Sequence, residues 1–176
     1  MTTVQTDAGR AREVALAAVE AVRRRDLDQI VALGHRDDYV DDFVAIGEFR
    51  GQEAVRGFFN ELFAAMPDFD LKVDRVVADE TTVAVKWQAR ATFTGAPFQG
   101  IQPTGRPVQL RGLDFFEIQD GLIRRNTVFY DGASFARQIG MLPREGSPMD
   151  RAMIALFNLK TRLVRPLRRS PAQARN

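Results

Sequence analysis

The spacing of apolar positions changes near the middle of the chain. Residues 7–66 carry apolar side chains mostly three or four positions apart, whereas residues 69–130 carry them mostly at every second position. The first spacing places apolar side chains on one face of a helix, and the second places them on one face of a strand. We therefore expect helices first and a sheet afterwards, which is typical of an α+β domain and not of alternating βαβ units.

The pattern predicts three helices in the first part of the chain. The first covers about residues 7–25, and the second begins near Asp26 and ends at Gly34, a residue type common at helix ends. The extended stretch YVDDFVAIGEF follows. The third helix, QEAVRGFFNELFAAM, has an apolar stripe that includes Phe59 and ends before Pro67.

The second part of the chain predicts a meander of antiparallel strands. FDLKVDRVVAD and TVAVKWQARATF are separated by ETT, a connection of hairpin length. VQLRGLDFFEIQDGLIRRNTVFYDG reads as a long hairpin that turns at Asp120-Gly121, a pair favoured in hairpin turns. A short helix, ASFARQIG, comes next. We expect the sheet to curve strongly around the N-terminal helices and to leave a concave pocket.

Alternation along the strands assigns side chains to the two faces of the sheet. The faces predicted to line the pocket contribute Trp87, Ala89, Asp114, Phe116, Thr127, Phe129 and Asp131. With Phe59 from the third helix and Tyr39 from the extended stretch, these residues predict an aromatic pocket that contains carboxyl groups.

The carboxyl groups of Asp114 and Asp131 are the candidate chemistry of this pocket. Burial disfavours the charged form of a carboxyl group and raises its pKa, so that it can exchange a proton near neutral pH, as general acid–base catalysis requires. Two structural alternatives stay open. Asp131 directly precedes GASFARQIG and could cap that helix, and Asp114 could pair with Arg111 or Arg125.

Composition excludes several other chemistries. The chain has no cysteine and a single histidine, His35, so disulfides, thiolate catalysis and two-histidine metal sites are not available. The acidic stretch DDYVDD, residues 37–42, is typical of a solvated cluster. It is not accompanied by a phosphate-binding loop that would favour magnesium. We expect neither a metal nor a cofactor.

The charge of the chain is divided unevenly. Residues 149–176 hold seven basic residues and one acid, a net charge of +6; since the whole chain carries +2, the rest carries −4. An acidic body disfavours nucleic acid as a partner. We divide the chain into a domain at 1–146 and a basic amphipathic extension at 147–176. The extension is expected to pack on the body or across a homodimer, and the alternative is weak contact with a membrane surface through residues 149–169.

Two features of the sequence bear on localisation. No apolar run reaches the ~18 residues that a membrane span needs. The first residues lack the charged and then apolar pattern of a secretion signal. We therefore expect a cytoplasmic protein.

Several motifs, taken in order, resemble the SnoaL-like polyketide (ester) cyclases of the nuclear-transport-factor-2-like superfamily. They are MPDFDLKVDRVVADETTVAVKW, the loop motif PTGRPV, GLDFFEIQDGLIRR and FYDGASFARQIGMLP, and the resemblance covers about residues 14–143. It implies a cone-like α+β barrel with a deep hydrophobic pocket. It also implies an acid–base aspartate at the end of the last strand, in the position of Asp131.

Two other branches of the superfamily imply different chemistry. Epoxide hydrolases carry Arg-x-Asp on the middle strand, where this chain has Arg90 followed by Ala91 and Thr92. Ketosteroid isomerases use an aspartate base, in the position of Asp42, and a neutral aspartate donor, in the position of Asp114. Their tyrosine on the first helix is absent here.

The expected function is therefore acid–base chemistry on a hydrophobic carbonyl compound by a cofactor-independent cyclase or isomerase. Asp131, Asp114 and Asp42 are the candidate catalytic residues. The alternatives are ketosteroid-isomerase-like proton transfer and a module that binds a hydrophobic small molecule without turnover, and an epoxide hydrolase is disfavoured.

Overall fold

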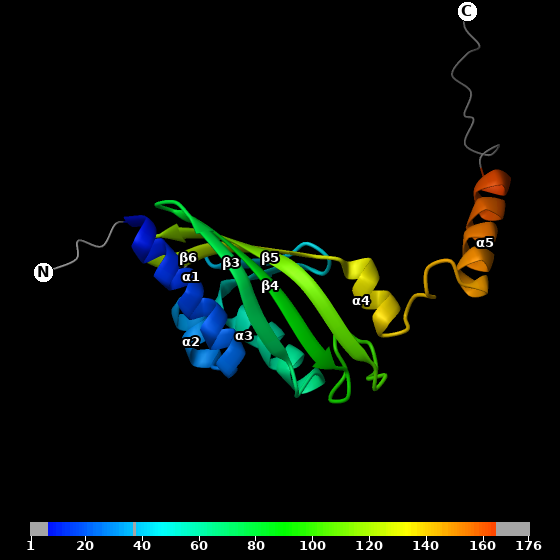
Figure 1. The fold of residues 1–176 in the computed structure, drawn as a ribbon, viewed down its shortest axis with the longest axis horizontal. Helices are drawn as coiled ribbons and strands as arrows, with labels where there is room; N and C mark the ends of the chain where they lie inside the picture. The colour runs from blue at the N-terminus through cyan, green and yellow to red at the C-terminus, as the bar shows by residue number, and fades with distance from the viewer. Residues whose placement is uncertain (1–6, 37, 165–176) are drawn as a thin grey trace, which may run out of the picture.

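The computed structural model describes residues 7–36 and 38–164 (Figure 1). In chain order its elements are α1 (Asp7–Arg24), α2 (Leu27–Ala32), β1 (Val40–Phe43), β2 (Gly47–Arg50), α3 (Gly51–Ala65), β3 (Asp70–Ala78), β4 (Thr82–Thr92), β5 (Pro107–Gln119), β6 (Leu122–Tyr130), α4 (Gly132–Gln138) and α5 (Pro148–Val164).

One six-stranded sheet organises the body, in the order β2-β1-β6-β5-β4-β3. The sheet curves around α1, α2 and α3 without closing into a complete barrel (Figure 1). This arrangement confirms the predicted α+β fold with a curved sheet around N-terminal helices. The predicted meander, β3 to β6, pairs antiparallel throughout, and β1 joins it by running parallel to β6.

The predicted helix ends have clear local causes. Asp26 caps α2, because its Oδ1 accepts a hydrogen bond of 2.9 Å from the backbone N–H of Gln29. The helix ends just before Gly34, as expected. α3 ends at Ala65, before Pro67. Its aromatic side chains Phe58 and Phe59 are buried against the sheet.

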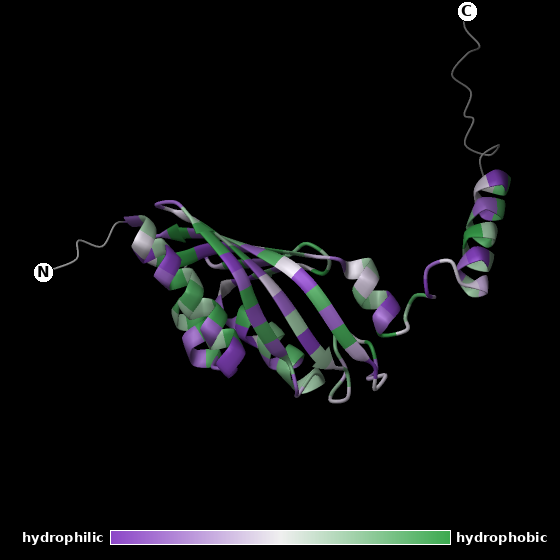
Figure 2. Ribbon diagram, viewed as in Figure 1, coloured by the Kyte–Doolittle hydropathy of each residue, from purple (hydrophilic) through white to green (hydrophobic). Residues whose placement is uncertain are grey.

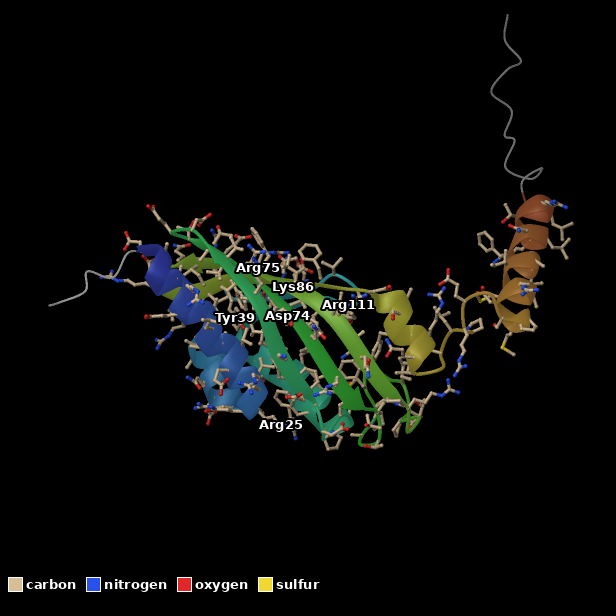
Figure 3. The ribbon with its side chains drawn as sticks, in the orientation of Figure 1. Arg25, Tyr39, Asp74, Arg75, Lys86 and Arg111 are labelled. Carbon is tan, nitrogen blue, oxygen red and sulfur yellow. The ribbon has the colours of Figure 1, made fainter. Side chains whose placement is uncertain are left out.

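The core lies between the helices and the concave face of the sheet. β4 alternates regularly, and its buried side chains on this face are Val83, Val85, Trp87, Ala89 and Ala91. Hydropathy accordingly alternates along the strands (Figure 2). The opposite face is rich in charged side chains such as Asp74, Lys86 and Arg111, which are exposed (Figure 3).

The long hairpin of β5 and β6 turns where the sequence predicts. Asp120 and Gly121 have φ angles of 53° and 75°. Positive φ at both central residues is characteristic of a type I′ turn, and glycine adopts it at no steric cost. The pairing of the two strands is then interrupted next to the turn. Glu117 lies opposite Arg125 and Ile118 lies opposite Ile123, so that Arg124 is an extra residue in β6.

α5 stands apart from the sheet (Figure 1). Its start is fixed locally: the backbone N–H of Asp150 donates to Ser147 Oγ at 3.2 Å, and Asp150 Oδ2 accepts from the N–H of Gly146 at 2.9 Å. Large apolar side chains of the helix are exposed, among them Leu156 and Phe157. Within residues 7–36 and 38–164, no helix has the length and hydropathy that crossing a membrane requires.

Candidate active site

An apolar cavity of about 110 Å³ lies between the concave face of the sheet and the helices α1 and α3. Its aromatic walls are formed by Tyr39, Phe43, Phe58, Phe59, Trp87 and Phe116. Carbon atoms dominate this surface, which is typical of pockets that bind small hydrophobic molecules. The few polar groups that reach the cavity therefore decide what chemistry it can support.

Asp41 is the most deeply buried of these polar groups. It lies on β1 between Tyr39 and Phe43, and only 1% of its surface is exposed. Burial raises the pKa of its carboxyl group to about 8, the charges of Asp114 and Asp42 add to this rise, and the side chain of Asn126 opposes it. Asp41 Oδ1 has no hydrogen-bond partner among the described residues.

Asp114 brings a second carboxyl group to the cavity from β5. Its side chain is half-buried. Burial raises the pKa of Asp114 to about 7, while a hydrogen bond from Trp87 Nε1 to Asp114 Oδ1, at 2.9 Å, acts in the opposite direction. This bond favours the carboxylate, because an N–H donor stabilises negative charge.

Gly112 makes the position of the Trp87 indole possible. The two residues lie opposite each other on β5 and β4. A Cβ atom at position 112 would lie 2.2 Å from Trp87 Cζ2 and 2.7 Å from the carbonyl oxygen of Phe129. Only glycine leaves room for the indole to reach Asp114.

Tyr39 adds a hydroxyl group to the same end of the cavity. Burial raises the pKa of its phenol well above the usual value, and the charges of Asp41 and Asp114 contribute. The phenol therefore stays protonated and remains a hydrogen-bond donor at neutral pH. Gly34 provides the space for its ring, since a Cβ there would lie 2.1 Å from Tyr39 Cδ1.

No basic side chain of the described residues pairs with either cavity carboxyl group. The cavity wall includes Arg90, but its guanidinium group is exposed and lies 3.4 Å from Asp70. The described residues also contain no cluster of three acidic or histidine side chains that could hold a metal ion. The alternative pairing of Asp114 with Arg111 or Arg125 does not occur.

Most of the predicted pocket residues line the cavity. This set comprises Tyr39, Phe59, Trp87, Ala89, Asp114 and Phe116. Four other predicted residues, Asp42, Thr127, Phe129 and Asp131, do not line it.

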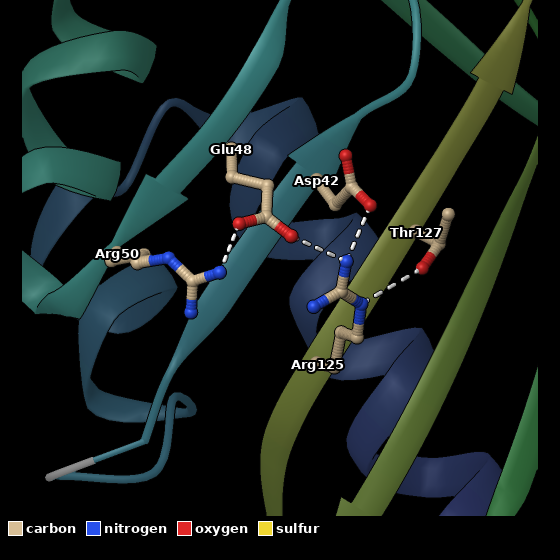
Figure 4. Close-up of polar contacts among 5 residues, drawn as sticks. All are labelled: Asp42, Glu48, Arg50, Arg125 and Thr127. Carbon is tan, nitrogen blue, oxygen red and sulfur yellow. Dashed lines mark hydrogen bonds and ion pairs between the residues drawn. The ribbon is translucent and has the colours of Figure 1, made fainter.

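Asp42 points to the other side of β1. It forms an ion pair with Arg125, which also pairs with Glu48 and donates to Thr127 Oγ1 at 3.4 Å (Figure 4). Its neighbour Asp41 occupies the cavity instead. Alternation with Tyr39 and Phe43 could have identified Asp41, and the expectation that the whole acidic stretch is solvated is wrong for this residue.

The face of β6 that lines the cavity is opposite to the predicted one. Asn126, Val128 and Tyr130 line the cavity, whereas 45% of Phe129 is exposed. The extra residue Arg124 explains the difference, because one inserted residue reverses the alternation beyond it. The predicted inward positions of Thr127 and Phe129 are therefore wrong.

Asp131 lies where β6 ends and α4 begins. Its Oδ1 accepts a hydrogen bond of 2.8 Å from the backbone N–H of Ser134, and the side chain is exposed. This is the capping geometry that the sequence left open as the alternative to a place in the pocket.

Solved structures with the same fold come from several bacteria. AclR, a putative hydroxylase from Streptomyces galilaeus, is 23% identical and has a TM-score of 0.67; the match covers 93% of this chain and 99% of that chain. A putative SnoaL-like polyketide cyclase from Jannaschia sp. CCS1 is 20% identical, with a TM-score of 0.67 and coverage of 76% and 94%.

A putative ketosteroid isomerase from Kribbella flavida DSM 17836 is 23% identical, with a TM-score of 0.56 and coverage of 72% of this chain and 81% of that chain. No curated protein matches the chain. The family model described as SnoaL-like polyketide cyclase matches residues 12–139, which contain the whole sheet and both cavity aspartates. By this match, the chain belongs to the SnoaL-like polyketide cyclase family.

Proposed function

We propose that this chain is an acid–base enzyme of the cyclase or isomerase type, acting on a hydrophobic carbonyl compound without a cofactor. The observation that supports it best is the pair of cavity carboxyl groups, Asp41 and Asp114, in an apolar wall without a basic partner. A structural role alone does not account for two such groups, because burying unpaired carboxyl groups costs free energy of folding.

Asp114 and Tyr39 suit two parts of a proton transfer. The hydrogen bond from Trp87 favours the carboxylate of Asp114, so Asp114 is the base that removes a proton from the carbon next to the substrate carbonyl. Tyr39, whose phenol keeps its proton, donates a hydrogen bond to the carbonyl oxygen as negative charge develops on it. Asp41 keeps its proton and orients the substrate.

The fate of the enol separates the two reaction types. In an isomerase, the proton held by Asp114 returns to a different carbon of the substrate. In a cyclase, the enol carbon forms a new bond to a second carbonyl carbon, and the oxygen of that carbonyl takes up the proton. Both routes consume and release the same proton, and neither needs an oxidant or reductant.

Hydrogen–deuterium exchange of an enolisable ketone on an apolar ring system, beginning with 2-tetralone, tests the proposal. Proton NMR in D₂O follows exchange at the carbon next to the carbonyl, and quenching of Trp87, the single tryptophan, reports binding. We expect Asp114→Asn to slow exchange about 10²-fold or more while the dissociation constant changes little.

Two variants serve as matched controls. Asp42→Asn changes the neighbouring residue on the outer face, and Asp131→Asn keeps a side chain that can cap α4. Both are expected to exchange at the wild-type rate. A slow Asp131→Asn variant beside a normal Asp114→Asn variant would return the catalytic role to the residue that the family resemblance implies. Binding without exchange in the wild type would support the non-catalytic binding module instead.

A further inference from the structure

The parallel junction of β1 and β6 places two polar side chains next to each other at the cavity wall. Asp41 and Asn126 lie directly opposite each other in the register of the two strands. Their exposed fractions are 1% and 5%, and both line the cavity. A hydrogen bond from the side chain of Asn126 to the carboxyl group of Asp41 opposes the rise in the pKa of Asp41, so the two side chains are in direct contact.

One oxygen atom of each side chain lacks a hydrogen bond. Within the part of the chain that the structure describes, nothing donates to Asp41 Oδ1 or to Asn126 Oδ1. A buried acceptor without a donor costs roughly 1–3 kcal/mol of folding free energy. Each such group in a native structure calls for an explanation, such as a catalytic role or a bound partner that supplies the missing donor.

The chemistry of the two oxygen atoms restricts that partner. Asn126 Oδ1 can only accept, so it needs an O–H or N–H donor. Asp41 in its neutral form can donate a proton as well as accept one. A hydroxyl group satisfies both, since it donates to Asn126 and accepts from Asp41. A ketone or an ether oxygen leaves Asn126 unsatisfied.

We propose that Asp41 and Asn126 form a hydroxyl-binding subsite, so that the ligand of this cavity carries a phenol or alcohol group on an apolar ring system. The inference rests on the proposed function in taking the cavity as the substrate site, and it adds the class of substrate. The carbonyl chemistry remains with Asp114 and the hydroxyl group orients the ring.

Binding of two probes that differ in one O–H group tests this subsite. Equilibrium dialysis of 2-naphthol and 2-methoxynaphthalene against the full chain gives their dissociation constants. We expect 2-naphthol to bind at least about tenfold more tightly, which corresponds to one buried hydrogen bond. Asn126→Leu removes the acceptor and is expected to bring the two constants within about threefold of each other.

The neighbouring residue provides the matched control. Thr127→Val lies on the outer face of β6 and should keep the preference for 2-naphthol. Asn126→Ala, which adds no volume, repeats the test if the leucine variant fails to fold, as circular dichroism would show. A preference for 2-naphthol that persists without Asn126 overturns the subsite, as does equal binding of both probes or binding of neither by the wild type.

The preference for 2-naphthol does not depend on catalysis. Asp114→Asn should retain the preference for 2-naphthol even where it abolishes exchange of 2-tetralone. A wild type that prefers 2-naphthol without catalysing exchange would refute the proposed function and leave the hydroxyl-binding subsite in place.

Discussion

Asp41 and Asp42 show how strongly one position along a strand decides the chemistry of a residue. The first lies in the cavity with a raised pKa, and the second pairs with Arg125 on the outer face. Alternation in β1 separates them, because successive side chains point to opposite faces. Sequence reasoning located the acidic stretch, but the family resemblance assigned the base to Asp42, one residue away from the buried carboxyl group.

The raised pKa values predict how stability depends on pH. Asp41 and Asp114 have folded-state pKa values of about 8 and about 7, above the value of 3.8 for an unperturbed aspartate. The folded state therefore binds more protons than the unfolded state between about pH 4 and pH 8. Stability from these groups is fully present below pH 3.8 and is lost as the pH rises through 7 and 8.

Thermal unfolding from pH 5 to pH 9 measures this effect. We expect the melting temperature of the wild type to fall over this range, and that of the Asp41→Asn/Asp114→Asn double variant to fall at least about 4 °C less. Exposed acids with lowered pKa values, such as Glu48 and Asp79, act in the opposite direction but below this range. Parallel curves for the two proteins would contradict the raised pKa values.

At the level of elements, the alternation of β4 was predictable and that of the interrupted β6 was not. Alternation in β4 correctly placed Trp87 and Ala89, because β4 keeps its period throughout and its ladder with β5 has no register shift. In β6, alternation counted from the buried Ile123 places Thr127 and Phe129 inward, and the extra residue Arg124 reverses it. Hydropathy also misled, since Phe129 is apolar and exposed whereas Asn126 is polar and buried. The lack of a donor for Asn126 Oδ1 depends on tertiary contacts that no local pattern contains.

The close contact between β4 and β5 makes position 112 sensitive to added volume. Gly112→Ala would place a methyl group against the Trp87 indole, displacing it and breaking its bond to Asp114. We expect a loss of about 1–3 kcal/mol in the free energy of unfolding, measured by urea denaturation with circular dichroism.

Gly57→Ala is the matched control for this substitution. It lies within α3, and a Cβ atom there would have no neighbour within 4 Å. Replacing a helical glycine by alanine is expected to stabilise the protein by roughly 0.5–1 kcal/mol. Equal effects of the two substitutions would show that the indole of Trp87 moves aside without a loss of stability.

At the scale of the whole molecule, the body and α5 depend little on each other. The apolar side chains of α5 are exposed, and its first turn is capped by residues of its own segment. The match to AclR covers 93% of this chain. Residues 1–147 make up about 84% of the 176 residues, so the match extends into residues 148–176.

Removal of residues 148–176 should therefore leave the body intact. We expect the melting temperature of the truncated chain to stay within about 2 °C of the full chain, since little apolar surface is lost from the core. A large decrease would show that α5 packs on the body or on a second copy in solution.

Contact of the extension with a membrane surface remains a prediction, and residues 165–169 of its predicted segment lie outside the described residues. Flotation with anionic liposomes, comparing the full and truncated chains, measures it. Equal flotation of the two chains would end the membrane hypothesis.

The extra residue Arg124 has a consequence for how this protein can change. The strand that follows it carries two complete sets of side chains, one with Asn126, Val128 and Tyr130 and one with Thr127 and Phe129. The position of a single inserted residue selects which set meets the ligand. Deletion of Arg124 would exchange the two sets in one genetic event, without any substitution. A family that varies its substrates on one scaffold could thus alter a whole cavity wall by gaining or losing one codon.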